Sequence, residues 1–301
     1  MPWEKKGFIF NVDGTKEWAL EYASIPFVDK INDNKYRIYF SSRNSLNRSS
    51  VGYFEWDVNE PKKISNVSEQ PILEPGKLGT FDDTGVMATS IVNYNNKKYL
   101  YYVGWNQPKT VPFRWSIGLA ISHNNGATFE RFSDGPIVDR NPIDPYFASS
   151  PSVILDGDVW RMYYISGTGW KKINDEDICP YNIRYAESKD GINWIRNGII
   201  SVDFKNSNEN KVARANVFKE NDIYKMFYCY AINEYHIGYA ESKDGIKFDR
   251  KDHLAGIESS SEGWDSKMIE YPFVLKHNDR KFLFYNGNEY GQSGIGYAEW
   301  N

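Results

Sequence analysis

The chain has 301 residues and a formal net charge of −4, and aromatic side chains make up 16% of it. This length suffices for one large domain with an ample core, and we expect a single domain over residues 1–301. The acidic balance offers no clustered Lys and Arg to displace counterions, so we expect no nucleic-acid partner. Because no apolar run approaches the roughly 20 residues that cross a bilayer, we expect no membrane span either.

Cysteine usage and the N-terminal residues indicate the compartment. Cys179 and Cys229 are too few for a disulfide framework, and residues 1–6, Met-Pro-Trp-Glu-Lys-Lys, contain no apolar signal region. We therefore predict a cytoplasmic protein whose two thiols are reduced.

Five pairs of short strands follow one another along the chain. Each pair consists of an apolar segment, a polar turn and an aromatic-rich segment, a composition typical of strands. The pairs are residues 25–28 with 36–40, 90–92 with 99–103, 152–155 with 160–164, 216–218 with 224–228, and 273–275 with 282–285.

A repeated β-hairpin follows the second, third and fourth pairs. Its full copies occupy residues 117–129, 183–194 and 237–248, and a truncated copy occupies residues 295–300. Each full copy has an Asn-Gly or Asp-Gly turn, which tolerates the positive φ of a tight hairpin, and then an aromatic residue that opens the second strand. One alanine of the repeat recurs at positions 120, 186, 240 and 298. Repetition at this spacing in an all-β sequence predicts a propeller or a solenoid.

Four strands per unit predict a five-bladed β-propeller with four-stranded antiparallel blades. The last unit stops at Trp300-Asn301 without a fourth strand, whereas residues 7–12 form a strand with no partner near it in the sequence. We expect this N-terminal strand to complete the last blade, because closure removes the unpaired edges of an open seam.

Residues just before the first strand of each blade converge at one mouth of the central channel of a propeller, where we expect the binding site. Asp82, Asp144 and Asp265 lie seven residues upstream of the positions on which their blades align. An Asp at a fixed offset in a repeat commonly hydrogen-bonds the backbone of its own turn. We interpret Asp144 and Asp265 in this way, and substrate binding is the alternative role for both. Asp82 and the adjacent Asp83 are candidates for a catalytic base or a charge stabiliser. The aligned positions are Pro26, Thr89, Pro151, Ala215 and Pro272.

Glu270 lies two residues before Pro272, among the apolar residues of segment 268–274. A carboxylate in such surroundings is costly unless it is used or paired. Burial raises the pKa of a carboxyl group, as a general acid requires. Arg214, one residue before the aligned position of the neighbouring blade, is the candidate partner that orients Glu270.

Loops between the second and third strands open on the same mouth and combine aromatic with polar side chains. An aromatic face covers the C–H side of a sugar ring, and polar groups bind its hydroxyls, so the loops predict a small-molecule or oligosaccharide glycan as ligand. We expect about half of the Trp side chains to pack between blades instead. Glu17 and Glu21, before the first strand of blade one, can supply a further carboxylate or belong to a solvated loop. The loop residues are Arg43, Arg48, Trp105, Arg114, Trp115, Trp170, His236, Asn288 and Tyr290.

These features resemble the five-bladed propellers of glycoside hydrolase families 43, 32 and 130 over the whole chain. The resemblance rests on the strands of residues 150–154 and 160–164, the repeated hairpins, and Glu270-Tyr271-Pro272. This last triplet is similar to the Glu-x-Pro motif that holds the proton donor in families 43 and 32. Family 43 usually has an Asp beside the first-blade Pro and another just after the aligned position of the second blade, whereas this chain has Ile25 and Ser90 there. The usual base is therefore missing from its usual place.

Three functions are compatible with these residues. The first is a glycoside hydrolase-like enzyme that cleaves or transfers a glycosyl group, with Glu270 as general acid. The second is a phosphorylase or glycosyltransferase of intracellular glycan metabolism or surface-polysaccharide assembly, in which arginines hold phosphate or a phosphorylated sugar donor. The third is a glycan-binding propeller without catalysis, which the missing base favours. Four scattered histidines and two cysteines have no ligand spacing, so we expect no metal and no cofactor. The arginines are Arg43, Arg48, Arg114 and Arg214.

Overall fold

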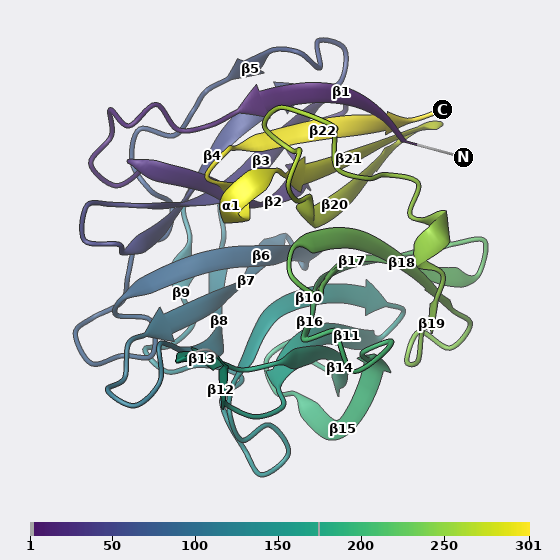
Figure 1. Ribbon diagram of the computed structural model, residues 1–301. Coiled ribbons are helices and arrows are strands. Elements are labelled where there is room, and N and C mark those ends of the chain that lie inside the picture. The colour runs from purple at the N-terminus through teal and green to yellow at the C-terminus, as the bar shows by residue number, and fades with distance from the viewer. Residues whose placement is uncertain (1–2, 174) are drawn as a thin grey trace.

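The computed structural model describes residues 3–173 and 175–301. Within these residues the regular elements are β-strands, apart from one 3₁₀ turn, η1 (Asp252–Leu254), and one short helix, α1 (Asn288–Gly291) (Figure 1). The predicted all-β class is therefore confirmed. Both cysteines are buried, and no disulfide joins them.

The strands form five consecutive antiparallel groups, in which each strand pairs with the next. Groups one and two are β2 (Glu21–Lys30), β3 (Lys35–Arg43), β4 (Ser49–Asp57) and β5 (Ile64–Ser65), then β6 (Gly85–Tyr94), β7 (Lys97–Asn106), β8 (Arg114–Ser122) and β9 (Glu130–Arg131). Group three is β10 (Ala148–Asp156), β11 (Val159–Gly167), β14 (Tyr181–Ser188) and β15 (Ile195–Val202), with a side hairpin of β12 (Lys171–Ile173) and β13 (Glu176–Ile178). Group four is β16 (Lys211–Glu220), β17 (Ile223–Ala231), β18 (Tyr235–Ser242) and β19 (Asp249–Arg250). Group five is β20 (Glu270–His277), β21 (Arg280–Asn286), β22 (Ile295–Trp300) and β1 (Trp3–Phe10).

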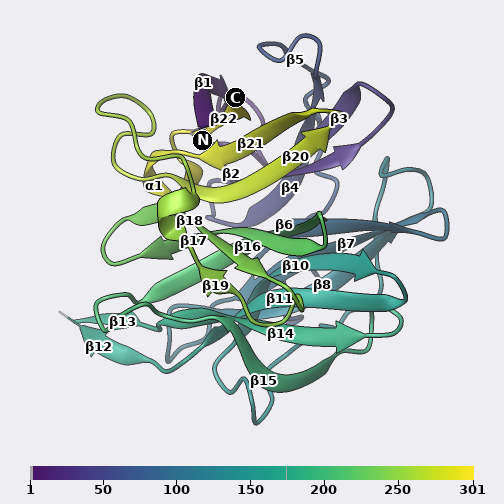
Figure 2. The same cartoon turned by 90° about the vertical axis from the view of Figure 1, so that its right-hand side faces the viewer.

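The N-terminal strand β1 is the outer strand of the last group. It runs antiparallel to β22, from Trp3 opposite Trp300 to Phe10 opposite Ile295, and Figure 2 shows the two chain ends side by side. The predicted pairing is confirmed, but the strand begins earlier than residue 7. The reason is the buried Trp3, whose ring packs edge-on against Phe227 and Trp300 at centroid distances of 5.9 and 4.9 Å.

The groups are less separate than the predicted four-stranded blades. A parallel bridge between Ser49 and Gly85 joins group one to group two, and another between Tyr181 and Lys211 joins group three to group four. Each bridge links a third strand to the first strand of the next group, so two sheets of eight strands result. Neighbouring groups therefore touch through their backbones as well as their side chains.

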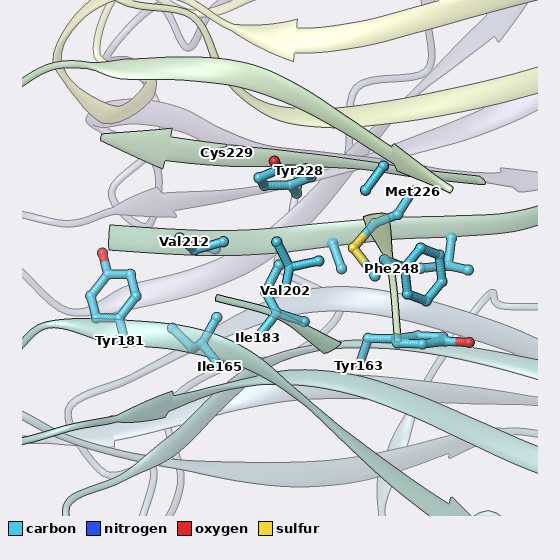
Figure 3. Close-up of a cluster of buried hydrophobic side chains, with 14 of the residues drawn as sticks. Tyr163, Ile165, Tyr181, Ile183, Val202, Val212, Met226, Tyr228, Cys229 and Phe248 are labelled. Atoms are coloured by element: carbon cyan, nitrogen blue, oxygen red, sulfur yellow. The ribbon is translucent and has the colours of Figure 1, made fainter. Parts of the chain in front are cut away.

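Five clusters of buried hydrophobic side chains form the core, and each lies between two neighbouring groups. Figure 3 shows the cluster between groups three and four, where Tyr163 and Ile183 face Val212 and Met226. The last and first groups share a cluster in the same way, with Trp56 of β4 packed edge-on against Phe282 of β21 at 5.1 Å. Every group thus buries apolar surface on both of its faces, the main source of stability in such a fold.

The repeated hairpins fold as the sequence predicts. Gly126, Gly191 and Gly245 have φ of 79°, 73° and 71° in their turns. The turns also tie neighbouring groups together, because the hydroxyl of Tyr101 donates to the carbonyl of Gly191 at 2.8 Å. In the next copy the hydroxyl of Tyr163 donates to the carbonyl of Gly245 at 2.7 Å.

Deletion of residues 1–12 removes β1 and two buried aromatic side chains, Trp3 and Phe10. Loss of one such side chain costs about 3–5 kcal/mol, so we expect the melting temperature to fall by on the order of 10 °C. Thermal denaturation followed by circular dichroism measures it, with Phe8→Ala as control because Phe8 is about half exposed. If the deletion variant and the intact chain have the same melting temperature, β1 does not stabilise the last strand group.

Candidate functional site

The first strands of all five groups meet at one end around a cavity of about 790 Å³. Its wall includes Ile25, Met87, Ser150, Arg214 and Tyr271, one residue from each group. The predicted convergence at one mouth is therefore confirmed. The aromatic residues of the wall are Trp105, Phe113, Trp115, Tyr181, Tyr235, Tyr271 and Tyr290.

Four of these first strands carry a left-handed residue at the cavity. The φ is 59° at Ile25, 46° at Ser150, 52° at Arg214 and 54° at Tyr271, and a β-bulge coincides with each. Positive φ is unfavourable for residues other than glycine, above all for a β-branched one such as Ile25. Strain of this kind concentrates at functional sites.

Glu270 is fully buried beside this cavity. Three of its four counterparts two residues before the aligned positions, Met87, Ser149 and Ala213, line the wall. The Glu270 side chain instead lies beneath the surface, and the next residue, Tyr271, lines the wall. Neither carboxylate oxygen makes a hydrogen bond of good geometry among the described residues. Burial raises the pKa of Glu270 well above its usual range, and the positive charge of Lys211, the Tyr271 hydroxyl and the Tyr290 backbone N–H oppose this only in part. A carboxyl group that keeps its proton at neutral pH can act as a general acid.

Arg214 lines the cavity but does not pair with Glu270. No ion pair joins the two side chains in the described part of the chain, so the predicted orientation of Glu270 by Arg214 is wrong. The left-handed backbone at Arg214 directs the side chain across to the first group, where Nη2 donates to the carbonyl of Pro26 at 3.4 Å. Burial lowers the pKa of Arg214 to about 10, so the guanidinium stays charged at neutral pH.

Lys211 is a wall residue that the sequence analysis missed. Its Nζ lies 5.4 and 5.7 Å from the ring centroids of Tyr235 and Tyr290. Burial lowers the pKa of Lys211, and the nearby acidic side chains Glu234 and Glu176, with Glu270 when it is ionised, oppose the shift. A signal existed, because the residues four positions before the other aligned positions carry no charge: Tyr22, Gly85, Phe147 and Met268.

Asp82, Asp144 and Asp265 form a repeated structural link and do not line the cavity. Each accepts a hydrogen bond from the hydroxyl of a tyrosine 20 residues further along the chain. These are Tyr102, Tyr164 and Tyr285, at 3.1, 3.0 and 3.0 Å. Each also forms an ion pair with the outermost strand of its own group, through Arg131, Arg196 and Lys5 at 2.9, 2.8 and 2.7 Å.

The basic residues of this link stand directly opposite the repeated alanines, in the pairs Ala120–Arg131, Ala186–Arg196 and Ala298–Lys5. In group four, Arg250 opposite Ala240 pairs with Glu209 at 2.6 Å in the same manner. The catalytic role predicted for Asp82 is therefore not supported by its position. The turn interpretation of Asp144 and Asp265 is also wrong in detail, because both carboxylates bind across the group.

Other predicted residues lie outside the wall. The Asp83 carboxylate accepts from the backbone N–H of Gly79 at 2.9 Å, as a turn residue does. Asn288 Oδ1 accepts from the N–H of Lys267 at 2.7 Å and so holds a loop. Glu21 is exposed at the start of β2, and His236 is exposed beside Tyr230, with ring centroids 5.7 Å apart.

Five of the predicted binding residues do line the cavity, and a sixth lies next to it. Trp170 packs against Phe113 of the wall at a centroid distance of 5.1 Å. Phe113 in turn stacks on Trp115 at 3.9 Å, with the two planes 13° apart. The predicted residues in the wall are Arg43, Trp105, Trp115, Arg214 and Tyr290.

Ser90, which stands where a family 43 enzyme usually has an Asp, connects two groups. Its Oγ accepts from the N–H of Val153 at 3.0 Å, and Asn216 Oδ1 accepts from the N–H of Val274 at 2.8 Å in the same way. The wall residues that the structure describes include two carboxylates, Glu176 and Asp177, both on the exposed hairpin of group three. No first strand contributes a carboxylate to the described wall.

The described residues contain no group of three or more His, Cys, Asp and Glu side chains arranged to hold a metal ion. They also contain no helix that is long and apolar enough to cross a membrane.

The fold is similar, over almost the whole chain, to that of solved glycoside hydrolases. The structure is similar over 98% of its length to a glycoside hydrolase, of which it covers 91% (TM-score 0.77, 19% identity). It is also similar over 96% of its length to a thermostable family-43 glycoside hydrolase, of which it covers 92% (TM-score 0.71, 17% identity). At these identities the likeness establishes the fold.

The chain belongs to the same family as the uncharacterized protein Rv1502 of Mycobacterium tuberculosis, to which it is 40% identical over 298 residues, 99% of each chain. A shorter match joins it to a β-1,2-mannobiose phosphorylase of a Thermoanaerobacter species, at 26% identity over 126 residues, 39% of this chain and 41% of that one. No protein-family model matches the chain.

Asp144→Asn tests the structural role of the repeated link. The change leaves Arg184 and Arg196 without their buried carboxylate partner. Breaking a buried ion pair in this way costs roughly 3–5 kcal/mol, and urea denaturation measures the loss. Asp134→Asn, at an exposed carboxylate paired with Lys77, is the matched control and should change stability little. If Asp144→Asn keeps its stability but alters ligand binding, the structural assignment is wrong.

The buried carboxyl of Glu270 predicts a pH-dependent stability. Above the ordinary pKa of Glu, the unfolded chain releases this proton while the folded chain retains it, so the wild type loses stability as pH rises toward the raised pKa. Glu270→Gln has no such proton to lose. We expect the stability of the variant relative to wild type to grow with pH, by up to about 1.4 kcal/mol per unit.

Urea denaturation of both proteins between pH 4 and pH 8 checks this. Glu130→Gln, at an exposed glutamate of β9, controls for the loss of a carboxylate in general. A difference between wild type and Glu270→Gln that stays constant over this range contradicts a proton retained on Glu270.

Proposed function

We propose that this chain is a carbohydrate-active enzyme that cleaves or transfers a glycosyl group in the 790 Å³ cavity, with Glu270 as general acid. The observation that carries the proposal is the state of Glu270, which is fully buried, has no ion pair or hydrogen bond of good geometry among the described residues, and has a raised pKa. Burying an acid in this way costs stability. Carboxyl groups with strongly perturbed pKa values cluster at functional sites.

The wall of the cavity supports a sugar as the substrate. The aromatic residues Trp105, Trp115 and Tyr290 line the same cavity as Arg43 and Arg214. Rings of this kind cover the C–H face of a sugar, and the polar groups bind its hydroxyls. The fold shared with glycoside hydrolases makes an oligosaccharide the expected class of substrate.

Protonation of the glycosidic oxygen is the step assigned to Glu270. As the bond to the anomeric carbon breaks, the carboxyl gives its proton to the departing oxygen, and an acceptor attacks the anomeric carbon. Glu270 must become accessible for this step, because Tyr271 and not Glu270 lines the wall in the present conformation. Glu176 and Asp177 are the wall carboxylates available to assist the acceptor.

The acceptor is water in a hydrolase, inorganic phosphate in a phosphorylase and a second sugar in a transferase. The absence of a carboxylate from the described first-strand wall favours an acceptor that needs no base, and the match to a mannobiose phosphorylase is in keeping with this. Turnover that depends on inorganic phosphate would assign phosphorolysis.

The fold that holds this site is, we further propose, a single domain, a closed ring of five blades. The five strand groups, the five hydrophobic clusters between them and the pairing of β1 with β22 support a ring in which the last blade packs on the first.

Glu270→Gln should lose turnover by roughly 10²–10⁴-fold, since the amide keeps the shape of the side chain but cannot give up a proton. Product formation is followed by NMR over a panel of glycosides and oligosaccharides, each with and without inorganic phosphate. Glu69→Gln, at an exposed carboxylate paired with Lys16 away from the cavity, is the matched control. Full activity of Glu270→Gln on a substrate that the wild type turns over refutes the assignment.

A glycan-binding propeller without catalysis is the second candidate, and one observation favours it: first strands contribute no carboxylate to the described wall. In this case sugars bind but are never turned over, and Glu270→Gln alters affinity alone.

A further inference from the structure

The cavity contains a buried positive charge that nothing in the protein neutralises. Arg214 is 1% exposed, its Nε has no hydrogen-bond partner, and Nη2 makes one long bond of 3.4 Å to the carbonyl of Pro26. In the described residues no carboxylate lies within ion-pair distance of it. A buried guanidinium without an anion is costly, so its retention in the wall of a cavity indicates a charge supplied from outside.

Two further cations of the wall are also without ion pairs in the described part of the chain. Lys211 is mostly buried between the rings of Tyr235 and Tyr290. Arg43 donates to Asn47 Oδ1 at 2.8 Å, and its guanidinium lies 4.8 Å from the ring centroid of Tyr22. All three positive side chains line one cavity without an ion pair in the described residues, although Glu234 and Glu176 lie near enough to raise the pKa of Lys211.

The negative groups of the wall do not balance these charges. Asp177 lies 3.8 Å from Lys172 on its own hairpin, and Glu176 is exposed on the same hairpin. Glu270 retains its proton in the buried state described above. The described wall thus carries an excess of positive charge, although the whole chain is acidic.

The surroundings of the cations favour an anion that is attached to a ring. Tyr290, which is 42% exposed, and the partly buried Tyr271 and Trp115 line the same wall as the cations. A small free anion needs only the charges, whereas an acidic sugar uses the charges and the ring faces together. The planar fork of Arg214 suits two-point contact with a carboxylate or a phosphate. Because Arg214 is 1% exposed, it must become accessible for this contact, as Glu270 must for catalysis.

We propose that the glycan bound in this cavity carries an anionic substituent, a carboxylate or a phosphate monoester, which Arg214 binds with support from Lys211 and Arg43. The inference rests on the proposed function only in that the ligand is a glycan. It names the substrate class, acidic rather than neutral sugars.

Calorimetric titration of the intact chain tests the proposal with matched sugars that differ only at one carbon. The probes are the methyl glycosides of glucose, galactose and mannose, the corresponding uronic acids and 6-phosphates, acidic and neutral oligosaccharides of the same backbones, and inorganic phosphate alone. We expect one acidic series to bind at least about 10-fold more tightly than its neutral counterpart. Uronate against 6-phosphate distinguishes the two sources of negative charge.

Arg214→Gln should weaken binding of the acidic ligand by about 10–100-fold, the usual worth of a hydrogen bond to a charged group, with little effect on the neutral one. Lys211→Gln should act in the same direction and serves if Arg214→Gln does not fold, as circular dichroism will show. Arg140→Gln, at an exposed arginine outside the wall, is the matched control and should bind as the wild type does.

Three results overturn the inference. They are equal affinity for acidic and neutral sugars, absence of binding by every acidic probe, and binding of inorganic phosphate that depends on Arg214 while acidic sugars gain nothing over neutral ones. The last result makes the anion a separate co-substrate.

The outcome is independent of whether the chain is an enzyme. Acidic sugars that bind through Arg214 but are never turned over leave the inference standing and refute the proposed catalysis. Turnover of a neutral sugar that depends on Glu270 and is unchanged in Arg214→Gln supports the proposed catalysis and refutes the inference of an acidic ligand.

Discussion

Every strand group in this protein has two apolar faces, and the rest of the structure follows from the need to cover both. A sheet with one apolar face can bury it against a single neighbour, but each of these groups needs a neighbour on both sides. The cluster of Trp56, Phe282 and Phe284 between the first and last groups shows how the requirement is met at the ends of the chain. Because the groups also cross-link through Ser90 and Asn216 near the cavity, the packing fixes the first strands relative to one another.

The same arrangement explains why polar chemistry concentrates at one end of the first strands. Left-handed residues such as Ser150 and Arg214 break the alternation of the strands there, so side chains enter the cavity that regular strands would direct elsewhere. The strain is tolerated because neighbouring groups hold the backbone on both sides. Packing thus supplies the rigidity, and the bulges supply the site.

Much of the fold could be predicted from local sequence, because strands and tight turns are encoded by residues close together. The Asp-Gly turns, the aromatic strands and the unpartnered N-terminal strand were sufficient for this. Asp82 was misassigned because its partner Arg131 lies 49 residues away and its hydrogen-bonded Tyr102 lies 20 away. A single sequence does not show that both reach the same carboxylate, although a basic residue recurs 10 or 11 positions after the first three repeated alanines.

The candidate site was predicted in part for a related reason. Composition and position identified Arg43, Trp105, Trp115, Arg214 and Tyr290 as residues of the mouth. The missing ion pair between Arg214 and Glu270 depends on a backbone bulge, and the contact of Lys211 with two tyrosine rings depends on loops from different groups. Neither is encoded by spacing along the chain.

The pairing of β1 with β22 also has a consequence for synthesis. Within this chain β1 is made long before its partner, because some 290 residues separate the two strands, about 15 to 60 seconds of translation. During that interval Trp3 lacks the rings of Phe227 and Trp300, and the face of the first group that packs against Phe282 and Phe284 is uncovered. The nascent chain is therefore exposed to misassociation until β22 emerges.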